Sequence, residues 1–514
     1  MARATRPTYS LRYCSYMTIE PAENALLTRV SLGRLDAEQD ENLLQYFLDT
    51  GSVDEVRAGK FLVVGRKGSG KTAIFRHLAA TLPGEVVQMD LDRYVFQAHR
   101  KLIDGGVTPA SAYTESWRAA IVIAMFAALS PKLRWLRRRR GIKILRKIGA
   151  GPNAGPFGAI LEWLARVRNI KLPSVTGVFD LGQIQIESPS EALIEATTTR
   201  LVDELLELIA PQITAMQATT LIDRLDDAWD GEPDSLRLIA GAVRAARDLA
   251  LKFREKGRAL PPVVVFLRSD LWDKCTFNDK NKIPPDTVEL NWDDDELASI
   301  FARRVEASTD LPADQAWETL FTADRMRQSV TAKSYVLKRT LGRPRDVIAY
   351  TQHAVDVARD NSHDVIAKDD VYEAERRYSR HVIRELQDEI AEHVHDFNNV
   401  LNAMKALRKR TFSRDKWLEV SKNSGIHADE AGNILQMLFE AGVIGLLRSG
   451  GSGGGRTTIY HYQERLLQLN AADTQLQVHP ALTRELNLTE KYSKRRSTLT
   501  DGAEDDQPEA GMET

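Results

Sequence analysis

The stretch "VVGRKGSGKT", from Val63 to Thr72, constrains the fold of this chain more than any other feature of its sequence. It fits the pattern G-x-x-x-x-G-K-[ST], and the apolar run 61–64 that leads into it indicates a buried strand of a parallel sheet. The residues after it, "TAIFRHLAATL", have apolar side chains at helical spacing. A glycine-rich turn between a strand and a helix is the context in which this pattern binds phosphate, whereas an ordinary glycine-rich turn binds nothing.

The expected roles of the individual positions follow from the way such a loop binds phosphate. Backbone N–H groups of the turn and the positive end of the helix dipole face the phosphate oxygens. Lys71 is expected to reach the β- and γ-phosphates of ATP, and Thr72 is expected to ligate Mg²⁺. The predicted cofactor-binding residues of this loop are Gly65, Arg66, Lys67, Gly68, Ser69, Gly70, Lys71 and Thr72.

Length and composition narrow the class of protein. With 514 residues the chain is long enough for more than one domain, and its net charge of −2 gives no overall basic field of the kind that nucleic-acid-binding proteins show. The two cysteines, Cys14 and Cys275, lack metal-ligand spacing and favour a cytoplasmic location. The longest apolar run, 119–129, is too short for a transmembrane helix, and the first residues lack the apolar core of a signal peptide.

A second motif supplies the carboxylates that hydrolysis of ATP requires. In "TTLIDRLDD", residues 219–227, Asp223 ends an apolar strand and is expected to hold Mg²⁺ together with Thr72. Arg224 occupies the next position, where a catalytic acid often stands. Asp226 and Asp227 follow within one turn, and either of them is a candidate catalytic base. The alternative is a strand that ends in a solvated acidic turn.

Two further segments place cations where a nucleotide could meet them. "VVVFLRSD", residues 263–270, indicates a neighbouring strand whose polar end would set Arg268 and Ser269 beside the γ-phosphate; an ordinary strand cap is equally open. "GRPRD" puts Arg343 and Arg345 at the start of a helix, from which they could fold over the nucleotide as part of a lid. Cations are disfavoured at that end of a helix dipole, which hints at a bound anion, although a solvated helix start is also open.

The chain divides by pattern into several parts. From 397 to 467 the order is three helices, a strand, a Gly-rich loop and a strand, which is the winged-helix plan. Residues 36–59 are expected to form a helix, a turn and a short lead into the first strand, and 190–209 a helix that ends at Pro211. The predicted parts are an irregular N-terminal segment (1–35), an ATPase core (36–292) with a helical insertion at about 94–210, a helical lid (293–394), a winged-helix domain (395–490) and a disordered tail (491–514).

The order of "VGRKGSGKT", "LIDRLDD", "FLRSDLW", "ELNWDDDELASIFARR", "GRPRDVI" and the terminal winged helix resembles a bacterial P-loop ATPase family. That family is similar to AAA+ Orc/Cdc6-like and STAND/KAP ATPases and is often met in mobile-element and phage-defence settings. The resemblance covers roughly 36–490 and implies an α/β, ASCE/AAA+-like P-loop NTPase fold with strand order 5-1-4-3-2. It further implies Walker A at Lys71 and Thr72, Walker B at Asp223, sensor 1 at Arg268 or Ser269, and sensor 2 at Arg343 or Arg345. Because Arg224 replaces the usual second acid, hydrolysis is expected to be slow.

A basic run in the predicted insertion suggests a further partner. "PKLRWLRRRRGIKILRKIG", residues 131–149, holds nine basic residues and no acid, and four of them are consecutive: Arg137, Arg138, Arg139 and Arg140. Such a run could grip nucleic-acid phosphates or lie on an anionic membrane. It could also be a solvated face that pairs with acids elsewhere in the chain or in a neighbouring subunit.

The predicted winged helix is a poorer candidate for DNA binding. Its expected recognition helix, "HADEAGNILQMLFEAG", carries Asp429, Glu430 and Glu440 and no Lys or Arg. Uncompensated carboxylates are repelled by DNA phosphates, so packing on the ATPase or binding of a protein is favoured. Basic residues before the helix and Arg456 in the wing leave backbone contact open.

Together these features predict a molecular switch that binds ATP and Mg²⁺ and hydrolyses ATP slowly. Closure of the lid would change how the insertion and the winged helix are presented to a protein effector or to other copies of the chain. The alternatives are a DNA-binding regulator or replication-type ATPase, and a P-loop kinase of a small molecule. The lid and the winged helix disfavour the kinase.

Overall fold

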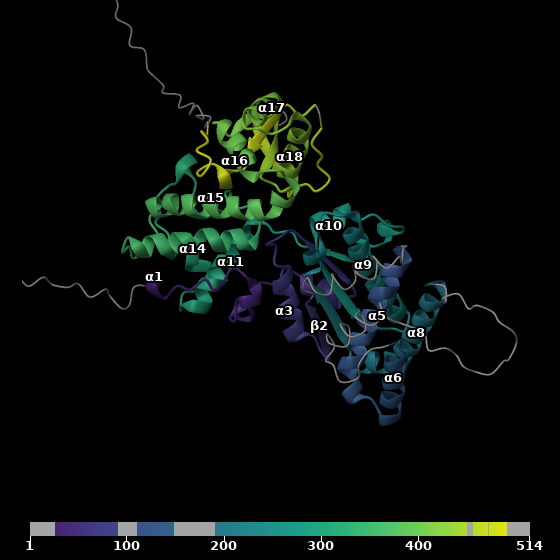
Figure 1. Cartoon of the computed structure of the whole chain (residues 1–514). Coiled ribbons are helices and arrows are strands. Elements are labelled where there is room, and N and C mark those ends of the chain that lie inside the picture. Colours follow the sequence, from purple (N-terminus) through teal and green to yellow (C-terminus); the bar gives the residue numbers. More distant parts are fainter. Residues whose placement is uncertain (1–25, 91–109, 149–190, 450–455, 471, 491–514) are drawn as a thin grey trace, which may run out of the picture.

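The computed structural model describes residues 26–90, 110–148, 191–449, 456–470 and 472–490. An α/β core occupies one side of the molecule, and a mostly helical second half lies beside it (Figure 1). The predicted tail, most of the predicted N-terminal segment and parts of the predicted insertion fall outside the described residues.

The core is built on a five-stranded parallel sheet. Its order is β5-β1-β4-β3-β2, so β4 separates the strand that leads into the phosphate-binding loop from the strand that ends at Asp223. This order and the parallel pairing confirm the predicted α/β P-loop NTPase fold. The strands are β1 (Leu62–Gly65), β2 (Val86–Asp90), β3 (Thr219–Asp223), β4 (Val263–Arg268) and β5 (Thr287–Glu289).

Helices cover both faces of this sheet. Along β1, Leu62 and Val64 belong to one hydrophobic cluster and Val63 to another, because successive side chains of a strand point to opposite faces. The first cluster joins the sheet to α5, α8 and α9, and the second joins it to α2 and α3. The helices of the core are α2 (Ser52–Arg57), α3 (Lys71–Thr81), α5 (Ala110–Leu129), α6 (Trp135–Ile148), α8 (Glu191–Ala215), α9 (Pro233–Arg254) and α10 (Ser269–Lys274).

The long apolar run of the sequence lies in α5. Residues 119–126 are all buried, and α5 packs against α8 and α9. The run is therefore apolar on every side because protein surrounds it. No helix in the described residues has the length and apolar character needed to cross a membrane.

Two local predictions in the core are wrong. The helix α8 continues through Pro211 to Ala215, because the neighbouring Ile209 and Ile213 are fully buried and their packing outweighs the lost backbone hydrogen bond. Residues 36–51 form short 3-10 turns rather than the expected helix. There the Asp40 carboxylate is buried, accepts a hydrogen bond from the Tyr46 hydroxyl and pairs with Arg304 of the lid, which pulls the segment out of helical spacing.

The second half of the chain begins with the helical lid. A capping box at Asp293 and Glu296 starts α11, and the two longest lid helices stack Tyr350 on Tyr378 with ring centroids 4.9 Å apart. The lid helices are α11 (Asp294–Ser308), α12 (Ala316–Leu320), α13 (Ala332–Leu337), α14 (Pro344–Asp360) and α15 (Lys368–Ile390). The short N-terminal helix α1 (Leu26–Arg29) packs on α14, where Arg359 donates to the carbonyl of Leu27.

The C-terminal domain, residues 395–490, packs on the end of the lid. Its described elements are three helices and four short strands, and the strands form an antiparallel sheet of order β6-β9-β7-β8; the winged helix stays a prediction. A single hydrophobic cluster runs from Leu297 in the lid to Leu488 in this domain, so the two parts share a core. The elements are α16 (Phe397–Ala406), β6 (Thr411–Ser413), α17 (Arg414–Asn423), α18 (Ala428–Glu440), β7 (Ile444–Ser449), β8 (Arg456–Tyr460) and β9 (Gln475–Val478).

Short 3-10 helices complete the described chain. They are η1 (Ala37–Gln39), η2 (Leu43–Gln45), η3 (Ser130–Lys132), η4 (Leu225–Ala228), η5 (Lys280–Lys282), η6 (Pro284–Asp286), η7 (Ala313–Gln315), η8 (Arg327–Ser329), η9 (Ala391–His393) and η10 (Pro480–Leu482).

Candidate nucleotide-binding site

The phosphate-binding loop lies where the sequence places it, between β1 and α3. Gly68 and Gly70 have φ values of +80° and +97°, which side chains with a Cβ rarely adopt, and Gly70 directly precedes the first turn of α3. A Cβ at Gly65 would collide with the hydroxyl of Ser69. These glycines therefore permit a tight loop that ends at a helix N-terminus, the arrangement that exposes backbone N–H groups to an anion.

Lys71 is buried in the middle of the loop. Its ammonium donates to the carbonyls of Gly65 and Arg66, at 3.1 Å each. Burial lowers the pKa of Lys71, and the nearby carboxylates of Asp226 and Asp223 act in the opposite direction. A lysine held only by two backbone carbonyls can exchange these contacts for phosphate oxygens, because a charged acceptor makes the stronger hydrogen bond.

Thr72 and Asp223 meet although 151 residues separate them. The hydroxyl of Thr72 donates to the Asp223 carboxylate at 2.9 Å. Burial raises the pKa of Asp223 to about 6, against the opposite effects of hydrogen bonds from the Arg224 backbone and Thr72 and of the Lys71 charge. The two residues that the sequence assigns to Mg²⁺ thus form one polar pair at the carboxyl edge of the sheet.

The two candidate bases, Asp226 and Asp227, differ in their surroundings. Both lie in η4, which begins after Arg224 in a left-handed conformation with φ of 63°. Asp227 accepts a hydrogen bond of 2.7 Å from the guanidinium of Arg224. Asp226 is the strongest electrostatic partner of Lys71 and also acts on Arg268. Of the two, Asp226 is therefore the carboxylate whose charge acts on Lys71 of the phosphate-binding loop.

The predicted sensor at the end of β4 lies beside the loop, since Arg268 is the register partner of Gly65. Its guanidinium makes two hydrogen bonds to Asp270, at 3.0 and 2.9 Å, and an ion pair of 3.9 Å to Glu389 of α15. Burial lowers the pKa of Arg268, but Asp270 and Glu389 outweigh it and raise the pKa overall. Ser269 is buried at the start of α10. A lid helix thus reaches Arg268 directly.

The predicted sensor 2 arginines dock the lid onto the phosphate-binding loop. Arg343 donates to the carbonyl of Lys67 at 3.2 Å, and the backbone N–H of Arg345 donates to the carbonyl of Gly68 at 3.4 Å. Asp346 and Glu385 bind the guanidinium of Arg343 at 2.8–3.1 Å. These carboxylates explain how cations are tolerated at the start of α14, where the sequence alone suggested a bound anion.

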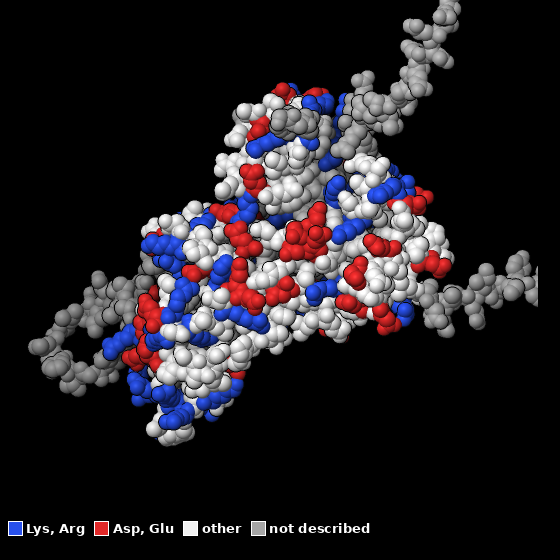
Figure 2. Space-filling model, turned by 180° about the vertical axis from the view of Figure 1, so that it is seen from behind, with Lys and Arg blue, Asp and Glu red and all other residues white. Residues whose placement is uncertain are grey.

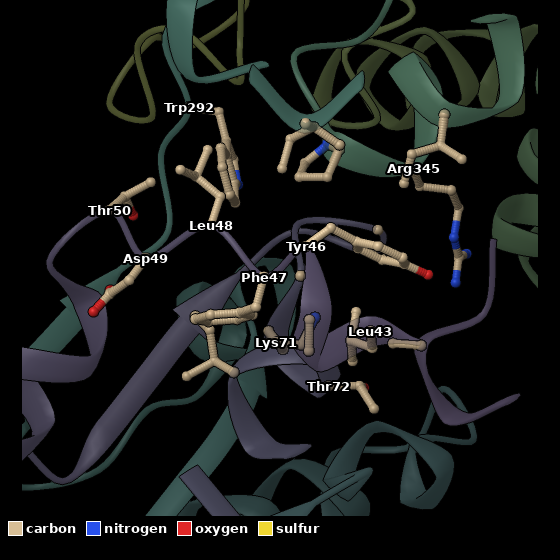
Figure 3. A pocket seen from close by; sticks show the side chains of 18 of the residues that line it. Leu43, Tyr46, Phe47, Leu48, Asp49, Thr50, Lys71, Thr72, Trp292 and Arg345 are labelled. Atoms are coloured by element: carbon tan, nitrogen blue, oxygen red, sulfur yellow. The ribbon is translucent and has the colours of Figure 1, made fainter. Parts of the chain in front are cut away.

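A cavity of about 130 Å³ opens beside Lys71 and Thr72. Figure 3 shows apolar side chains around it, from residues before β1 and from the start of the lid, with Lys71, Thr72 and Arg345 among them. The apolar lining includes Leu43, Tyr46, Phe47, Leu48 and Trp292. An apolar cavity that adjoins a phosphate-binding loop is suited to the base and sugar of a nucleotide.

Sequence reasoning missed this cavity. Trp292 donates its indole N–H to the carbonyl of Ser69 at 2.9 Å, and Phe47 stacks on His77 of α3 with ring centroids 4.0 Å apart. Trp292 lies far from the loop in the sequence, and Phe47 precedes the loop in an irregular segment. No rule of residue spacing therefore connects either of them to the loop. The sequence holds one signal, the position of Trp229, Trp272 and Trp292 near the motifs, but aromatic residues at strand and helix ends are usually part of the core.

The basic run forms most of α6, away from the phosphate-binding loop. Ile144 and Leu145 bury one face of this helix against the core, while Arg137 to Arg140 are exposed. Among the described residues, none of these four arginines has a carboxylate within ion-pair distance. Trp135 and Leu136 at the start of α6 are 66% and 72% exposed. Figure 2 shows Lys and Arg gathered at the lower end of the core, where α6 lies.

Comparison with known proteins gives one family match and several remote structural similarities. A family model described as the FunZ-associated C-terminal helical domain matches residues 295–387, which lie in the lid. No curated protein matches the sequence significantly.

Among solved structures the chain is similar to Cdc6p from Pyrobaculum aerophilum, with 14% identity over 90% of this chain and 97% of that chain and a TM-score of 0.28. It is also similar to the ORC2 protein of Aeropyrum pernix in ADPNP–ADP complexes, with 11% identity over 87% and 96% of the two chains and a TM-score of 0.34. The similarity to Drosophila ORC bound to DNA has 12% identity over 93% of this chain and 94% of that chain, with a TM-score of 0.28. Similarity this remote does not transfer a function.

Proposed function

We propose that this protein is an ATP-binding, slowly hydrolysing ATPase that acts as a molecular switch. Lys71 binds the β- and γ-phosphates, the N-terminus of α3 faces them, and the cavity lined by Tyr46, Phe47 and Trp292 takes the nucleoside. The resemblance of the motifs to AAA+ and STAND/KAP ATPases agrees with this role and connects it with mobile elements and phage defence.

The observation that carries the proposal is the contact between Thr72 and Asp223. Its 2.9 Å hydrogen bond joins the phosphate-binding loop to the end of the strand two positions away in the sheet. For a glycine-rich turn that binds nothing, a contact with a buried carboxylate at the end of a distant strand is not expected. The pair supports the assignment of both motifs to one site.

The same pair fits Mg²⁺. This ion is commonly held by one or two carboxylates together with substrate phosphates and water, so a single Asp with a hydroxyl is sufficient. The described residues contain no cluster of three or more His, Cys, Asp or Glu that could hold a metal ion by itself. When bound with ATP, Mg²⁺ would neutralise charge on the phosphates, and Thr72 and Asp223 would orient it.

Asp226 is the proposed base, because its charge acts on Lys71 while Asp227 is bound by Arg224. The site also holds three cations that we propose to interact with the phosphates: Arg268, Arg343 and Arg345. Arg268 and Arg343 are tied to α15 through Glu389 and Glu385, so a nucleotide that attracts these arginines would loosen their hold on the lid. This exchange of partners is the proposed switch.

Substitution of the carboxylates tests the proposal. Asp223→Ala is expected to abolish Mg²⁺-dependent ATP hydrolysis while nucleotide binding partly persists. Asp226→Asn should lower the turnover more than the matched Asp227→Asn, which removes the same charge one residue away. Turnover assays and nucleotide-binding calorimetry measure the two effects separately. Unchanged turnover in all three variants would contradict the assignment of the site.

A second activity, binding of nucleic-acid phosphates by α6, is supported by the exposed arginines of that helix. A membrane is the alternative: Ile144 and Leu145 are packed against the core, but Trp135 and Leu136 beside the arginines are exposed. Phosphates are acceptors to which exposed guanidinium groups bind without any rearrangement of the protein. The proposed partner is therefore a nucleic-acid backbone.

The salt dependence of DNA binding tests this second activity. Replacing Arg137, Arg138, Arg139 and Arg140 by Gln should shrink the slope of log K against log salt by up to ~3.6, about 0.9 for each lost contact. A matched control replaces four exposed or half-buried cations that already pair with neighbouring acids and should leave the slope nearly unchanged; these are Arg57, Lys60, Arg237 and Lys416. If the parent protein shows no salt-sensitive binding to single- or double-stranded DNA, α6 has another partner.

A further inference from the structure

A second cavity, of about 920 Å³, lies between the core, the lid and the C-terminal domain. Arg66 and Ser69 of the phosphate-binding loop line it, as do the segment before α14 and the strand β8. Trp292 lines both this cavity and the one beside Lys71. The cavity is therefore a separate space that adjoins the nucleotide site, and we refer to it as the interdomain cleft.

The interdomain cleft is strongly cationic. Among the described residues that line it, seven are basic and three are acidic. The basic residues are Arg66, Lys338, Arg339, Arg343, Arg410, Arg456 and Arg465, and the acidic residues are Glu289, Asp294 and Glu490. They come from the core, the lid and the C-terminal domain, so the charge is assembled only in the folded chain.

Three of the arginines are neutralised within the protein. Arg339 pairs with Glu375 at 2.9 Å, Arg343 with Asp346 at 2.8 Å, and Arg465 with Asp273 at 2.7 Å. These three contribute to the walls of the cleft, but their charges are already balanced by neighbouring carboxylates.

The other four cations lack such a partner in the described part of the chain. Arg66 donates to the carbonyls of Leu341 and Ala441, at 2.7 and 3.3 Å. Arg410 donates to the carbonyl of Val478 and the hydroxyl of Tyr460, at 2.9 and 3.2 Å. The remaining two, Lys338 and Arg456, are exposed and make no ion pair with another described residue.

Burial and the unpaired arginines of the cleft lower the pKa of a neighbouring histidine. Burial, and then the arginines Arg410 and Arg66, hold the pKa of His479 well below its ordinary value. His479 therefore stays neutral, with its imidazole between the hydroxyl of Tyr462 and the backbone N–H of Ala481. Burial lowers the pKa of Arg66 to about 10. An anion in the cleft would favour the charged form of this guanidinium.

We propose that the interdomain cleft binds a small, multiply charged phosphate compound, separately from ATP. The unpaired guanidinium and ammonium groups provide the donors that phosphate oxygens prefer. Because these groups come from three parts of the chain and line one cleft, a compact ligand with several charges can contact them together. Because Arg66 belongs to the phosphate-binding loop, such a ligand would also act on the nucleotide site; this consequence, unlike the binding itself, rests on the proposed function.

Calorimetry with inositol hexakisphosphate as a probe tests the binding. The titration is made at low salt in the Lys71→Ala background, so that the phosphate-binding loop does not contribute. The variant Lys338→Gln with Arg456→Gln removes two exposed cations of the cleft without breaking an ion pair between described residues, and should weaken binding at least about tenfold, since charge-assisted contacts are the strong ones. The control replaces Arg57 and Arg237, two exposed cations that pair with neighbouring acids, by Gln and should bind as well as its parent. A further variant, with Arg137 to Arg140 replaced by Gln, measures how much of the probe α6 binds.

Two outcomes would overturn the proposal. One is a lack of measurable binding by the Lys71→Ala protein. The other is binding that the α6 substitutions abolish and the cleft substitutions leave intact, which would place the probe on α6. Because neither result depends on ATP turnover, failure of the cleft can be told apart from failure of the ATPase.

Discussion

The arginines of the nucleotide site and those of α6 have opposite surroundings. Arg268 and Arg343 are largely buried, and each is held by two carboxylates, whereas Arg137 to Arg140 are exposed and have no carboxylate partner among the described residues. A buried guanidinium must be paired, because removal of its hydration is costly. Its partners also fix its position. An exposed guanidinium keeps its water and stays available to a phosphate that arrives from outside.

This difference in burial and pairing indicates which arginines can act on a bound nucleotide and which can bind an external phosphate. At the nucleotide site, a few fixed charges act on one bound molecule, so one substitution should have a large effect. On α6 the charges are equivalent to one another, so the effect of any one should be small and should depend on salt.

The largest effect is expected for Lys71→Ala, which removes the charge that we propose to bind the β- and γ-phosphates. ATP binding should weaken and hydrolysis should become unmeasurable, while circular dichroism shows that the fold is retained. Lys60→Ala, at a half-buried lysine paired with Glu55, is the control and should hydrolyse ATP like the parent. Normal turnover in the Lys71 variant would remove the basis for the nucleotide site.

A buried ion pair and an exposed one can be compared directly. Asp346→Ala removes one of the two carboxylates that hold the buried guanidinium of Arg343 and leaves Glu385, and it should lower the free energy of unfolding by about 3 kcal/mol. Asp360→Ala breaks an exposed pair with Arg377 and should cost at most about 1 kcal/mol. Urea denaturation measures both values. Equal losses would mean that burial does not distinguish the two sets of arginines.

The pKa of Asp223 predicts a dependence on pH. Because burial raises this pKa to about 6, the contribution of Asp223 to stability is fully present below its ordinary pKa and is lost as pH rises through about 6. Relative to Asp223→Asn, which stays neutral, the parent should lose up to about 3 kcal/mol of stability between pH 4 and pH 7. Denaturation in the absence of Mg²⁺ and nucleotide measures this difference, and a constant difference across that range would contradict the buried, protonated state.

The smallest effect on stability is expected on α6. Replacing Arg137 to Arg140 by Gln removes four exposed charges that make no ion pair with a described residue, so the free energy of unfolding should stay within about 0.5 kcal/mol of the parent. A loss comparable to that of Asp346→Ala would show that these arginines stabilise the protein itself, and the comparison between the two regions would then fail.

Much of the core could be predicted from local patterns. The glycines of the loop, the apolar run of β3 and the aspartate at its end each follow from neighbouring residues, and the strand order implied by the family resemblance agrees with the sheet. The three-residue strand β5 was not located, because Thr287–Glu289 is too short to show a period. The continuation of α8 through Pro211 was missed, because the burial of Ile209 and Ile213 cannot be read from the local sequence.

The sequence by itself determined which residues are the candidates for binding phosphate and Mg²⁺, because loop geometry and strand ends depend on residues close together in the chain. Only the tertiary structure decided how charges from distant segments combine. It brought the charge of Asp226 to act on Lys71, tied Arg343 to Glu385, and gathered Arg66 and Arg410 at one cleft. Electrostatic interactions depend on distance in space and on burial, and neither quantity is encoded in the spacing of residues along the chain.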